Sequence, residues 1–294
     1  MNRRAVAPTL VLLVVTASWG STFPLTKDLI TRMPVLDYLG VRFLIAGLIL
    51  AALAPRAVRR LPPALARRAA LLGVVYGLAQ ILQTTGLAHT SATVSGFLTG
   101  LYVVLTPVLA WAMLRQWIGK STWLAVAMAA VGLAMLSLNG LSIGFGEGLT
   151  AFSAVLYALH IVWLGLWGKP EHAVGVSAVQ LLAIGVVCLI CAAPDGITLP
   201  DRGIDWAAFA YLTVVAGLLG MLGQTWAQAH LPATRAAIIM TMEPVFAAIF
   251  GVGFGGDSVT VRMGIGCAIV LVAMLVAEIG PRRHPEVEVP RLSA

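Results

Sequence analysis

Charged residues are scarce in this sequence. Only 11% of its 294 residues are Asp, Glu, Lys or Arg, whereas soluble domains contain about 25%. Hydrophobic residues make up 60% of the chain, and the mean hydropathy is +0.94. This composition excludes an ordinary water-soluble domain, and it leaves no room for a nucleotide-binding or nucleic-acid-binding module.

The sequence also lacks the motifs of common enzymes. It contains no HExxH, no GxSxG, no Walker-type loop and no dinucleotide glycine fingerprint. Its three cysteines give no disulfide framework, and the CxxC of Cys188 and Cys191 lies within an apolar run, which favours packing over metal or redox chemistry. We therefore expect no catalytic residue, no metal and no cofactor, and we do not expect an enzyme.

Apolar runs long enough to span a membrane recur along the whole chain. About 20 residues cross a bilayer as a helix, and continuous apolarity without period-two alternation argues against a barrel. The predicted fold is an all-α polytopic membrane protein of ten transmembrane helices. The predicted spans are 8–27, 35–54, 67–88, 91–114, 122–139, 149–167, 175–193, 206–228, 233–252 and 260–279.

The basic residues predict how the chain is oriented. A cytoplasmic N-terminus places Arg3, Arg4, the five arginines of 56–68 and most other basic residues on the inside, as the positive-inside rule requires. The net charge of +7 thus reports topology, not a nucleic-acid partner. We predict a multi-pass protein of a bacterial-type inner membrane with both termini cytoplasmic. Its expected partners are the lipid bilayer and a small-molecule substrate. We expect the protein to be a monomer or a homodimer.

The two halves of the chain resemble each other. "QTTGLAHTSAT" (83–93) and "QTWAQAHLPAT" (224–234) share their Gln, Thr, Ala and His positions, and "TPVLA" (106–110) resembles "EPVFA" (243–247). We predict two five-helix repeats, 1–139 and 140–294, the second ending in a short cytoplasmic tail. Because five is odd, the second repeat enters the membrane from the opposite side. Inverted repeats are typical of transporters, although a duplication can also build a non-transporting scaffold.

Several longer stretches carry a family resemblance. "WGSTFPLTK" (19–27), "VRFLIAGLIL" (41–50) and "ATRAAIIMTMEPVFAAIFG" (233–251) resemble the EamA-type family of the drug/metabolite transporter superfamily. The resemblance implies ten helices in two inverted repeats around a central cavity lined mainly by helices 1, 3, 4, 6, 8 and 9. It also implies export of small metabolites, often amino acids or related compounds.

Polar and aromatic side chains form stripes on several predicted spans, because residues three and four apart share a helix face. Such stripes either join helices together or line a cavity, and Gln83 and Gln224 could instead pair with each other across the repeat axis. The candidate cavity residues are Trp19, Phe23, Tyr76, Gln80, Gln83, Thr99, Tyr102, Tyr157, His160, Trp163, Gln224, Gln228 and Glu243.

Glu243 is the most conspicuous of these candidates. A carboxylate in mid-membrane costs about 2.5–3.5 kcal/mol on insertion scales, so it should face the interior. Two roles stay open: anchoring helices at the cavity floor, or handling substrate and protons. His160 is a second candidate for proton coupling. Pro24, Pro107 and Pro244 are predicted bend points.

The sequence favours a secondary transporter that exports small metabolites by alternating access, coupled to protons or purely facilitative. The alternatives are an importer or exchanger of a phosphorylated or nucleotide-linked solute, and a non-transporting scaffold. A phosphate substrate would need a cationic pocket, and the sequence suggests only Lys27 and Arg235 near the cavity-lining spans. Arg42 and Lys27 are expected to form local ion pairs with Asp28 and Asp37.

Overall fold

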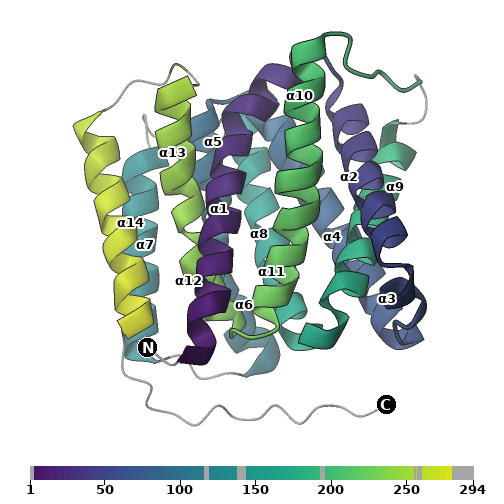
Figure 1. Ribbon diagram of the computed structural model, residues 1–294. Helices are drawn as coiled ribbons and strands as arrows, with labels where there is room; N and C mark the ends of the chain where they lie inside the picture. The colour runs from purple at the N-terminus through teal and green to yellow at the C-terminus, as the bar shows by residue number, and fades with distance from the viewer. Residues whose placement is uncertain are drawn as a thin grey trace.

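The computed structural model describes residues 3–115, 119–137, 144–192, 196–254, 256 and 260–279. All regular elements in these ranges are helices, arranged as an upright bundle (Figure 1), which agrees with the predicted all-α class. In chain order they are α1 (Arg3–Leu29), α2 (Val35–Leu53), α3 (Pro55–Arg59), α4 (Pro63–Ala88), α5 (Ala92–Thr99), α6 (Tyr102–Leu114), α7 (Lys120–Ser137), α8 (Phe145–Trp167), the 3₁₀ turn Pro170–His172, α9 (Ala173–Ala192), α10 (Gly203–Tyr211), the π-helix η2 (Leu212–Leu219), α11 (Gly220–Gln228), α12 (Ala233–Met240), α13 (Met242–Phe254) and α14 (Val261–Ile279).

Eight segments of the described chain are long and apolar enough to cross a membrane. They coincide with eight of the predicted spans, and they are Val6–Leu29, Val35–Leu53, Pro63–Ala88, Ala92–Leu114, Phe145–Trp167, Pro170–Ala192, Gly203–Gln228 and Ala233–Phe254. Helices α7 and α14 occupy the positions of the predicted fifth and tenth spans. They pack against each other at one side of the bundle (Figure 1).

Two of the spans are interrupted helices, and a third is distorted at its centre. The span 92–114 breaks at Gly100 and Leu101, between α5 and α6, and the span 233–254 breaks at Thr241, between α12 and α13. Pro107 lies inside α6, and Pro244 lies in the first turn of α13. The span 203–228 stays continuous but widens into the π-helix η2 at its centre, a geometry that occurs mostly as local bulges, often at functional sites.

The predicted bend points therefore differ from one another. Pro107 and Pro244 each lie in a span that is broken a few residues earlier. Proline has no N–H to donate to the carbonyl four residues before it, so it weakens the helix on that side. Pro24 lies within α1, which runs on without a break from Arg3 to Leu29.

Close helix contacts join the two halves of the chain. At the α2–α9 contact, a Cβ built on Gly47 would lie 2.8 Å from the backbone nitrogen of Leu182, and one on Gly185 would lie 2.6 Å from that of Leu44. Only glycine fits at such distances, and this is how membrane helices approach closely. The pairs α1–α13 and α4–α8 also pack across the halves.

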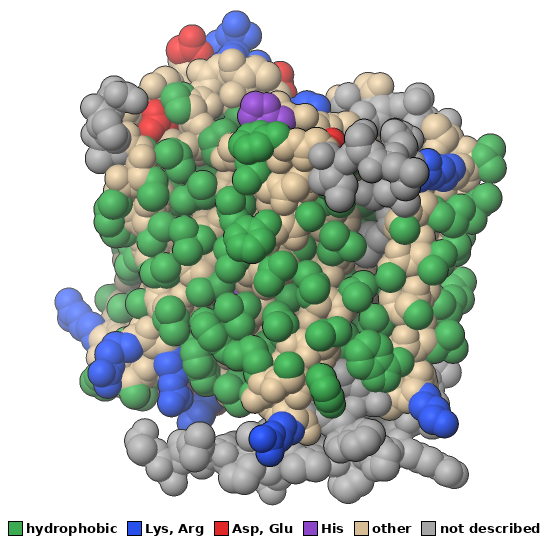
Figure 2. All heavy atoms as spheres, turned by 180° about the vertical axis from the view of Figure 1, so that it is seen from behind, with side chains coloured by type: hydrophobic (Ala, Val, Ile, Leu, Met, Phe, Trp, Pro, Cys, Tyr) green, Lys and Arg blue, Asp and Glu red, His purple; other side chains and the backbone are tan. Residues whose placement is uncertain are grey.

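The surface is consistent with a lipid environment. Hydrophobic side chains cover the middle of the face seen in Figure 2, with most Lys and Arg side chains toward its lower edge and a few near its upper edge, where the acidic side chains lie. Large apolar side chains such as Val14, Leu53 and Ile190 are at least 70% exposed. Such exposure would be costly in water but not against acyl chains.

Candidate functional site

A cavity lies in the interior of the bundle, between elements of both halves. Its volume of about 50 Å³ leaves room for a few water molecules. The lining comes from α1, α2, α4, α5, α6, α8, η2, α11 and the α12–α13 break: Trp19, Thr22, Phe23, Thr26, Tyr38, Arg42, Phe43, Tyr76, Gln80, Gln83, Thr84, Leu87, Thr99, Tyr102, Tyr157, Ile161, Ala216, Gly217, Met221, Gln224, Met240 and Glu243.

A chain of hydrogen bonds forms one polar wall of the cavity. Gln80 Nε2 donates to Tyr157 Oη (2.7 Å), and Tyr157 Oη donates to Gln83 Oε1 (2.8 Å). Gln83 Nε2 in turn donates to Thr99 Oγ1 (2.9 Å), which donates to the carbonyl of Ser95 (2.8 Å). The chain links α4 and α5 of the first half to α8 of the second, so it fixes the orientation of each amide at the cavity.

Gln224 extends the polar lining from α11. Its side chain is 1% exposed, and its Oε1 has no hydrogen-bond partner among the described residues. No hydrogen bond joins it to Gln83 in the described part of the chain, although both line the cavity. An unpaired buried acceptor is costly, so Gln224 presents an acceptor that a bound molecule can satisfy.

Trp19 meets the widened turn of η2 at the cavity. Its Nε1 donates to the carbonyl of Ala216 (2.9 Å). A π-helix shifts the hydrogen-bond register from i→i−4 to i→i−5 and so leaves a carbonyl available at the bulge. This contact joins α1 to the second half of the chain at the cavity wall.

Glu243 lies at the break between α12 and α13. It is 6% exposed and its Oε2 accepts a hydrogen bond from Tyr102 Oη (3.1 Å), which also donates to the carbonyl of Met240 (2.7 Å). Pro244 has no N–H to give to the Met240 carbonyl four residues earlier, so the tyrosine takes that place. Among the described residues Glu243 has no ion-pair partner, and its carboxyl group faces the cavity.

Arg42 is the cationic side chain of the lining. It is 6% exposed, and its guanidinium donates to Tyr38 Oη. Its Cζ lies 4.9 Å from the ring centroid of Tyr38 and 4.3 Å from that of Phe43. Its Nε has no hydrogen-bond partner, and no carboxylate forms an ion pair with it in the described part of the chain.

The predicted ion pairs around Arg42 are wrong. Asp37 accepts a hydrogen bond from the backbone N–H of Thr198 (2.9 Å), and Lys27 donates to the carbonyl of Thr90 (2.6 Å). Asp28 pairs with Arg32. Arg42 therefore lines the cavity without an ion-pair partner among the described residues. Helix α2 thus contributes to the lining in addition to the helices that the family resemblance implies.

Ten of the thirteen candidate residues from the sequence line this one cavity. They are Trp19, Phe23, Tyr76, Gln80, Gln83, Thr99, Tyr102, Tyr157, Gln224 and Glu243. The sequence assigned Arg42 to a local ion pair, and it did not identify Arg42, Tyr38 or the η2 carbonyl of Ala216 as part of the cavity. A signal for Arg42 was present, since it is an arginine within an apolar span.

The other three candidates lie outside the lining. His160 is fully buried, with Nε2 2.7 Å from Gln180 Oε1 and its ring edge-on to Tyr76. Trp163 stacks on Trp167 with centroids 5.3 Å apart. Gln228 Nε2 donates to the carbonyl of Ile161 (3.1 Å). Each of these side chains contacts its neighbours in the helix packing rather than the cavity.

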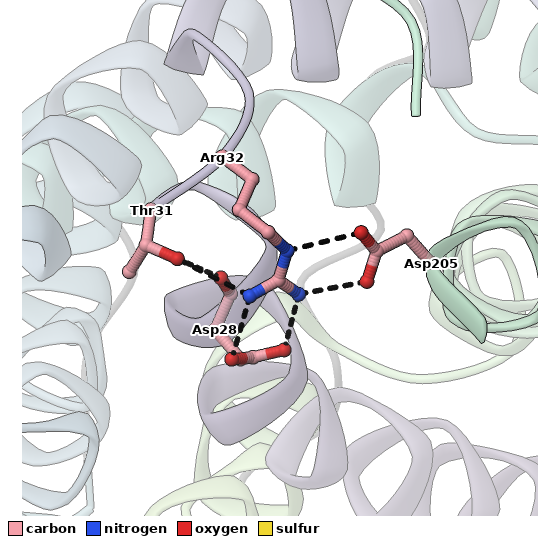
Figure 3. Close-up of polar contacts among 4 residues, drawn as sticks. All are labelled: Asp28, Thr31, Arg32 and Asp205. Carbon is pink, nitrogen blue, oxygen red and sulfur yellow. Dashed lines mark hydrogen bonds and ion pairs between the residues drawn. The ribbon is translucent and has the colours of Figure 1, made fainter. Parts of the chain in front are cut away.

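A cluster of charges closes the bundle at one end, named here the Arg32 end after the residue at its centre. Arg32 donates from Nε and Nη2 to both oxygens of Asp205 (3.0 and 2.7 Å) and from Nη1 and Nη2 to those of Asp28 (3.1 and 2.6 Å), as Figure 3 shows. These hydrogen bonds, with Asp28 contributing most, raise the pKa of Arg32 above its ordinary range. The pair Arg32–Asp205 links the α1–α2 loop to α10.

Two further contacts join the halves at the Arg32 end. Thr90 Oγ1 donates to Glu147 Oε1 (2.8 Å), and Asp37 accepts from Thr198. The end is therefore fastened by three polar links between segments far apart in the sequence. Opening the cavity on this side would require these links to separate.

Comparison with protein families gives two matches along the chain. The EamA-like transporter family matches residues 7–138 and again residues 144–278. The two matched segments fall on the two halves that the internal sequence similarity predicts.

Individual relatives match over nearly the whole length. An uncharacterized transporter of Archaeoglobus fulgidus is 28% identical over 277 residues, which cover 91% of this chain and 84% of the relative. The uncharacterized inner membrane transporter YedA of Escherichia coli is 23% identical over 91% of this chain and 89% of its own length. A solved crystal structure, 18% identical, aligns with a TM-score of 0.73 over 92% of this chain and 96% of that one, which shows a shared fold.

Proposed function

Because the chain belongs to the EamA-like transporter family and is a membrane transporter, we propose that it exports small metabolites across the inner membrane by alternating access. Amino acids or related compounds are the favoured substrates. The observation that carries the proposal is an interior cavity whose polar walls come from both halves of the chain. A site shared between two halves can face either side of the membrane when the halves rock about it.

The proposed architecture is two inverted five-helix repeats, 1–139 and 140–294. Support comes from the two family matches and from the pairing of the helices. α2 packs on α9 and α7 on α14, which are equivalent spans of the two predicted repeats. The pair α1–α13 likewise has its counterpart in α6–α8. Such reciprocal contacts are expected of two halves related by a twofold axis.

The proposed location is the inner membrane, with both termini and the basic α3 region cytoplasmic and the Arg32 end external. The relative YedA is described as an inner membrane transporter. Most of the Lys and Arg side chains in Figure 2 lie toward its lower edge, the end at which α3 lies in Figure 1, as the positive-inside rule expects of the cytoplasmic side. The external Arg32 end is fastened, so transport requires its polar links to open.

For proton coupling, Glu243 is the stronger candidate than His160. Glu243 lines the cavity, whereas His160 is fully enclosed and contacts Gln180. A titrating carboxyl group must meet both the substrate site and a path for protons, and only a residue of the lining can do so directly. Purely facilitative export is the alternative.

A phosphorylated substrate is disfavoured by the charge of the cavity. Arg42 is its one basic side chain among the described residues, and Glu243 adds a carboxyl group to the same lining. Phosphate groups are typically bound by clusters of Arg and Lys side chains through charge-assisted hydrogen bonds. The balance of one guanidinium and one carboxyl suits a solute with little or no net charge.

A flux screen in liposomes tests the proposal. Purified protein is reconstituted and efflux of amino acids, nucleobases and small amines is followed with and without a pH gradient, beside the Glu243→Gln variant. We expect efflux of at least one amino acid above protein-free liposomes, accelerated by the gradient and insensitive to it in Glu243→Gln. Retained gradient dependence in the variant rules out Glu243 as the coupling acid. No movement of any solute under any gradient would favour the scaffold.

A further inference from the structure

Arg42 is a buried charge that the fold does not neutralise. Its side chain is 6% exposed, in the first half of a membrane-spanning helix. A guanidinium carries five N–H donors, and the contacts of Arg42 are a hydrogen bond to Tyr38 and the faces of two aromatic rings. Its Nε is left without a partner. Charges inside membrane proteins are costly and are ordinarily paired.

The surroundings hold the guanidinium in place without saturating it. Tyr38 Oη accepts from Arg42 and lies 2.9 Å from Thr26 Oγ1, so the tyrosine is itself fixed by α1. The rings of Tyr38 and Phe43 flank the guanidinium at 4.9 and 4.3 Å. Cation–π contacts of this kind restrain a guanidinium while leaving its in-plane donors free for an anion.

No described carboxylate forms an ion pair with Arg42. In the described part of the chain, Asp37 is held by the backbone of Thr198, and Asp28 and Asp205 both pair with Arg32. Glu243 lines the same cavity but forms no ion pair with Arg42. A planar fork of N–H donors that faces a cavity matches the geometry of a carboxylate.

We propose that Arg42 binds the carboxylate of the transported solute, and that the cavity therefore accepts a small carboxylate-bearing molecule over the corresponding cation. Trp19, Phe23 and Tyr76 line the same cavity and offer apolar faces to the rest of the molecule. Because the cavity of about 50 Å³ holds only a few waters, it must widen when the solute binds, as the proposed alternating access requires. This inference rests on the proposed function for its physiological meaning, but binding to Arg42 is testable without transport.

A matched set of three compounds tests the inference by binding to purified protein. Phenylalanine, 2-phenylethylamine and 3-phenylpropanoate share one side chain and differ in their charged groups. Affinities are measured from ligand-induced shifts of the thermal midpoint for the wild type, Arg42→Gln and Arg42→Lys. Arg56→Gln, on the exposed arginine of α3, is the matched control.

We expect the wild type and Arg56→Gln to bind at least one of the two carboxylates about tenfold or more tightly than the amine, the scale of one lost charge-assisted contact. In Arg42→Gln this preference should fall below about twofold. Arg42→Lys should retain part of it, since an ammonium lacks the planar fork. Binding of phenylalanine but not 3-phenylpropanoate would show that the solute must be an amino acid.

Two results would overturn the inference: an undiminished carboxylate preference in Arg42→Gln, or a wild type that binds neither carboxylate better than the amine. If Arg42→Gln does not fold, Arg42→Lys tests the planar fork alone, and an undiminished preference in that variant overturns the inference that the guanidinium geometry recognises the carboxylate. Liposome flux separates this outcome from the proposed function. If amino acids leave the liposomes but Arg42→Gln keeps the carboxylate preference, the proposed function stands and the inference about Arg42 is rejected. If binding depends on Arg42 but no amino acid leaves the liposomes, the inference stands and the proposed function is rejected.

Discussion

Arg32 and Arg42 belong to the same half of the chain, yet the fold treats them in opposite ways. Arg32 sits at the end of the bundle with four charge-assisted hydrogen bonds to two carboxylates. Arg42 sits deeper, 6% exposed, without a carboxylate partner in the described chain. Arg32 is paired with carboxylates and holds parts of the chain together. Arg42 lines a cavity without a paired carboxylate, so its guanidinium can bind the anionic group of a ligand.

The contrast between the two arginines is tested most severely by reversing the charge on which Arg32 depends. Asp205 is 4% exposed, so Asp205→Lys places a cation against Arg32 with little water to screen it. We expect the largest loss of the series, a fall of several degrees in the thermal midpoint. The same change at the exposed Asp201 should have little effect.

A charge swap is the control for this result. The double variant Arg32→Asp with Asp205→Arg restores opposite charges at the same place and should recover most of the lost stability. Failure to recover would mean that Asp205 matters through its helix position in α10 rather than through the ion pair.

The second test neutralises each arginine in turn, without any ligand. Arg32→Gln leaves Asp205 buried and without its cation, so the thermal midpoint should fall. Arg42→Gln removes a desolvated charge with no counter-ion, so the midpoint should stay level or rise. A clear fall in Arg42→Gln would show that the cation–π contacts with Tyr38 and Phe43 outweigh the desolvation cost, and would make Arg42 structural.

The sequence was informative wherever helix periodicity alone decides the outcome. Gln80 and Thr84, or Trp19 and Phe23, lie four residues apart and share a face, and all of them reach the cavity. Three further candidates, Tyr157, His160 and Trp163, follow one another at steps of three residues in α8, and only Tyr157 lines the cavity. At 3.6 residues per turn, each step of three drifts about 60° around the helix, so Tyr157 lines the cavity while Trp163 points to another neighbour.

The sequence could not predict which hydrogen-bond partner each polar side chain finds in the folded structure. Asp37 looks like the natural counter-ion of Arg42, but the segment after α9 brings the backbone of Thr198 to it instead. His160 likewise is taken by Gln180 from α9. The π-helix at 212–219 has no sequence marker, so the contact of Trp19 with Ala216 could not be anticipated.

Tyr102→Phe extends the comparison to the acid of the cavity and should have a moderate effect. The change removes the hydroxyl that donates to the Met240 carbonyl (2.7 Å) and to Glu243 (3.1 Å). A net loss of about 1 kcal/mol in the free energy of unfolding is expected for a buried hydrogen bond. Denaturant titration in detergent measures it. A loss near zero would mean that Glu243 does not depend on Tyr102 for its position.

Asp28→Asn should have the smallest effect, although the carboxylate lies as close to Arg32 as Asp205 does. The N–O distances are 2.6 Å for Asp28 and 2.7 Å for Asp205, but the side chain of Asp28 is 70% exposed and that of Asp205 only 5%. Water and salt screen an exposed i,i+4 pair, so its loss should cost about 0.5 kcal/mol or less. Asp205→Asn should cost clearly more in the same titration. Equal losses would mean that distance rather than burial sets the strength of the cluster, and the unpaired burial of Arg42 would then lose its significance as a sign of a ligand.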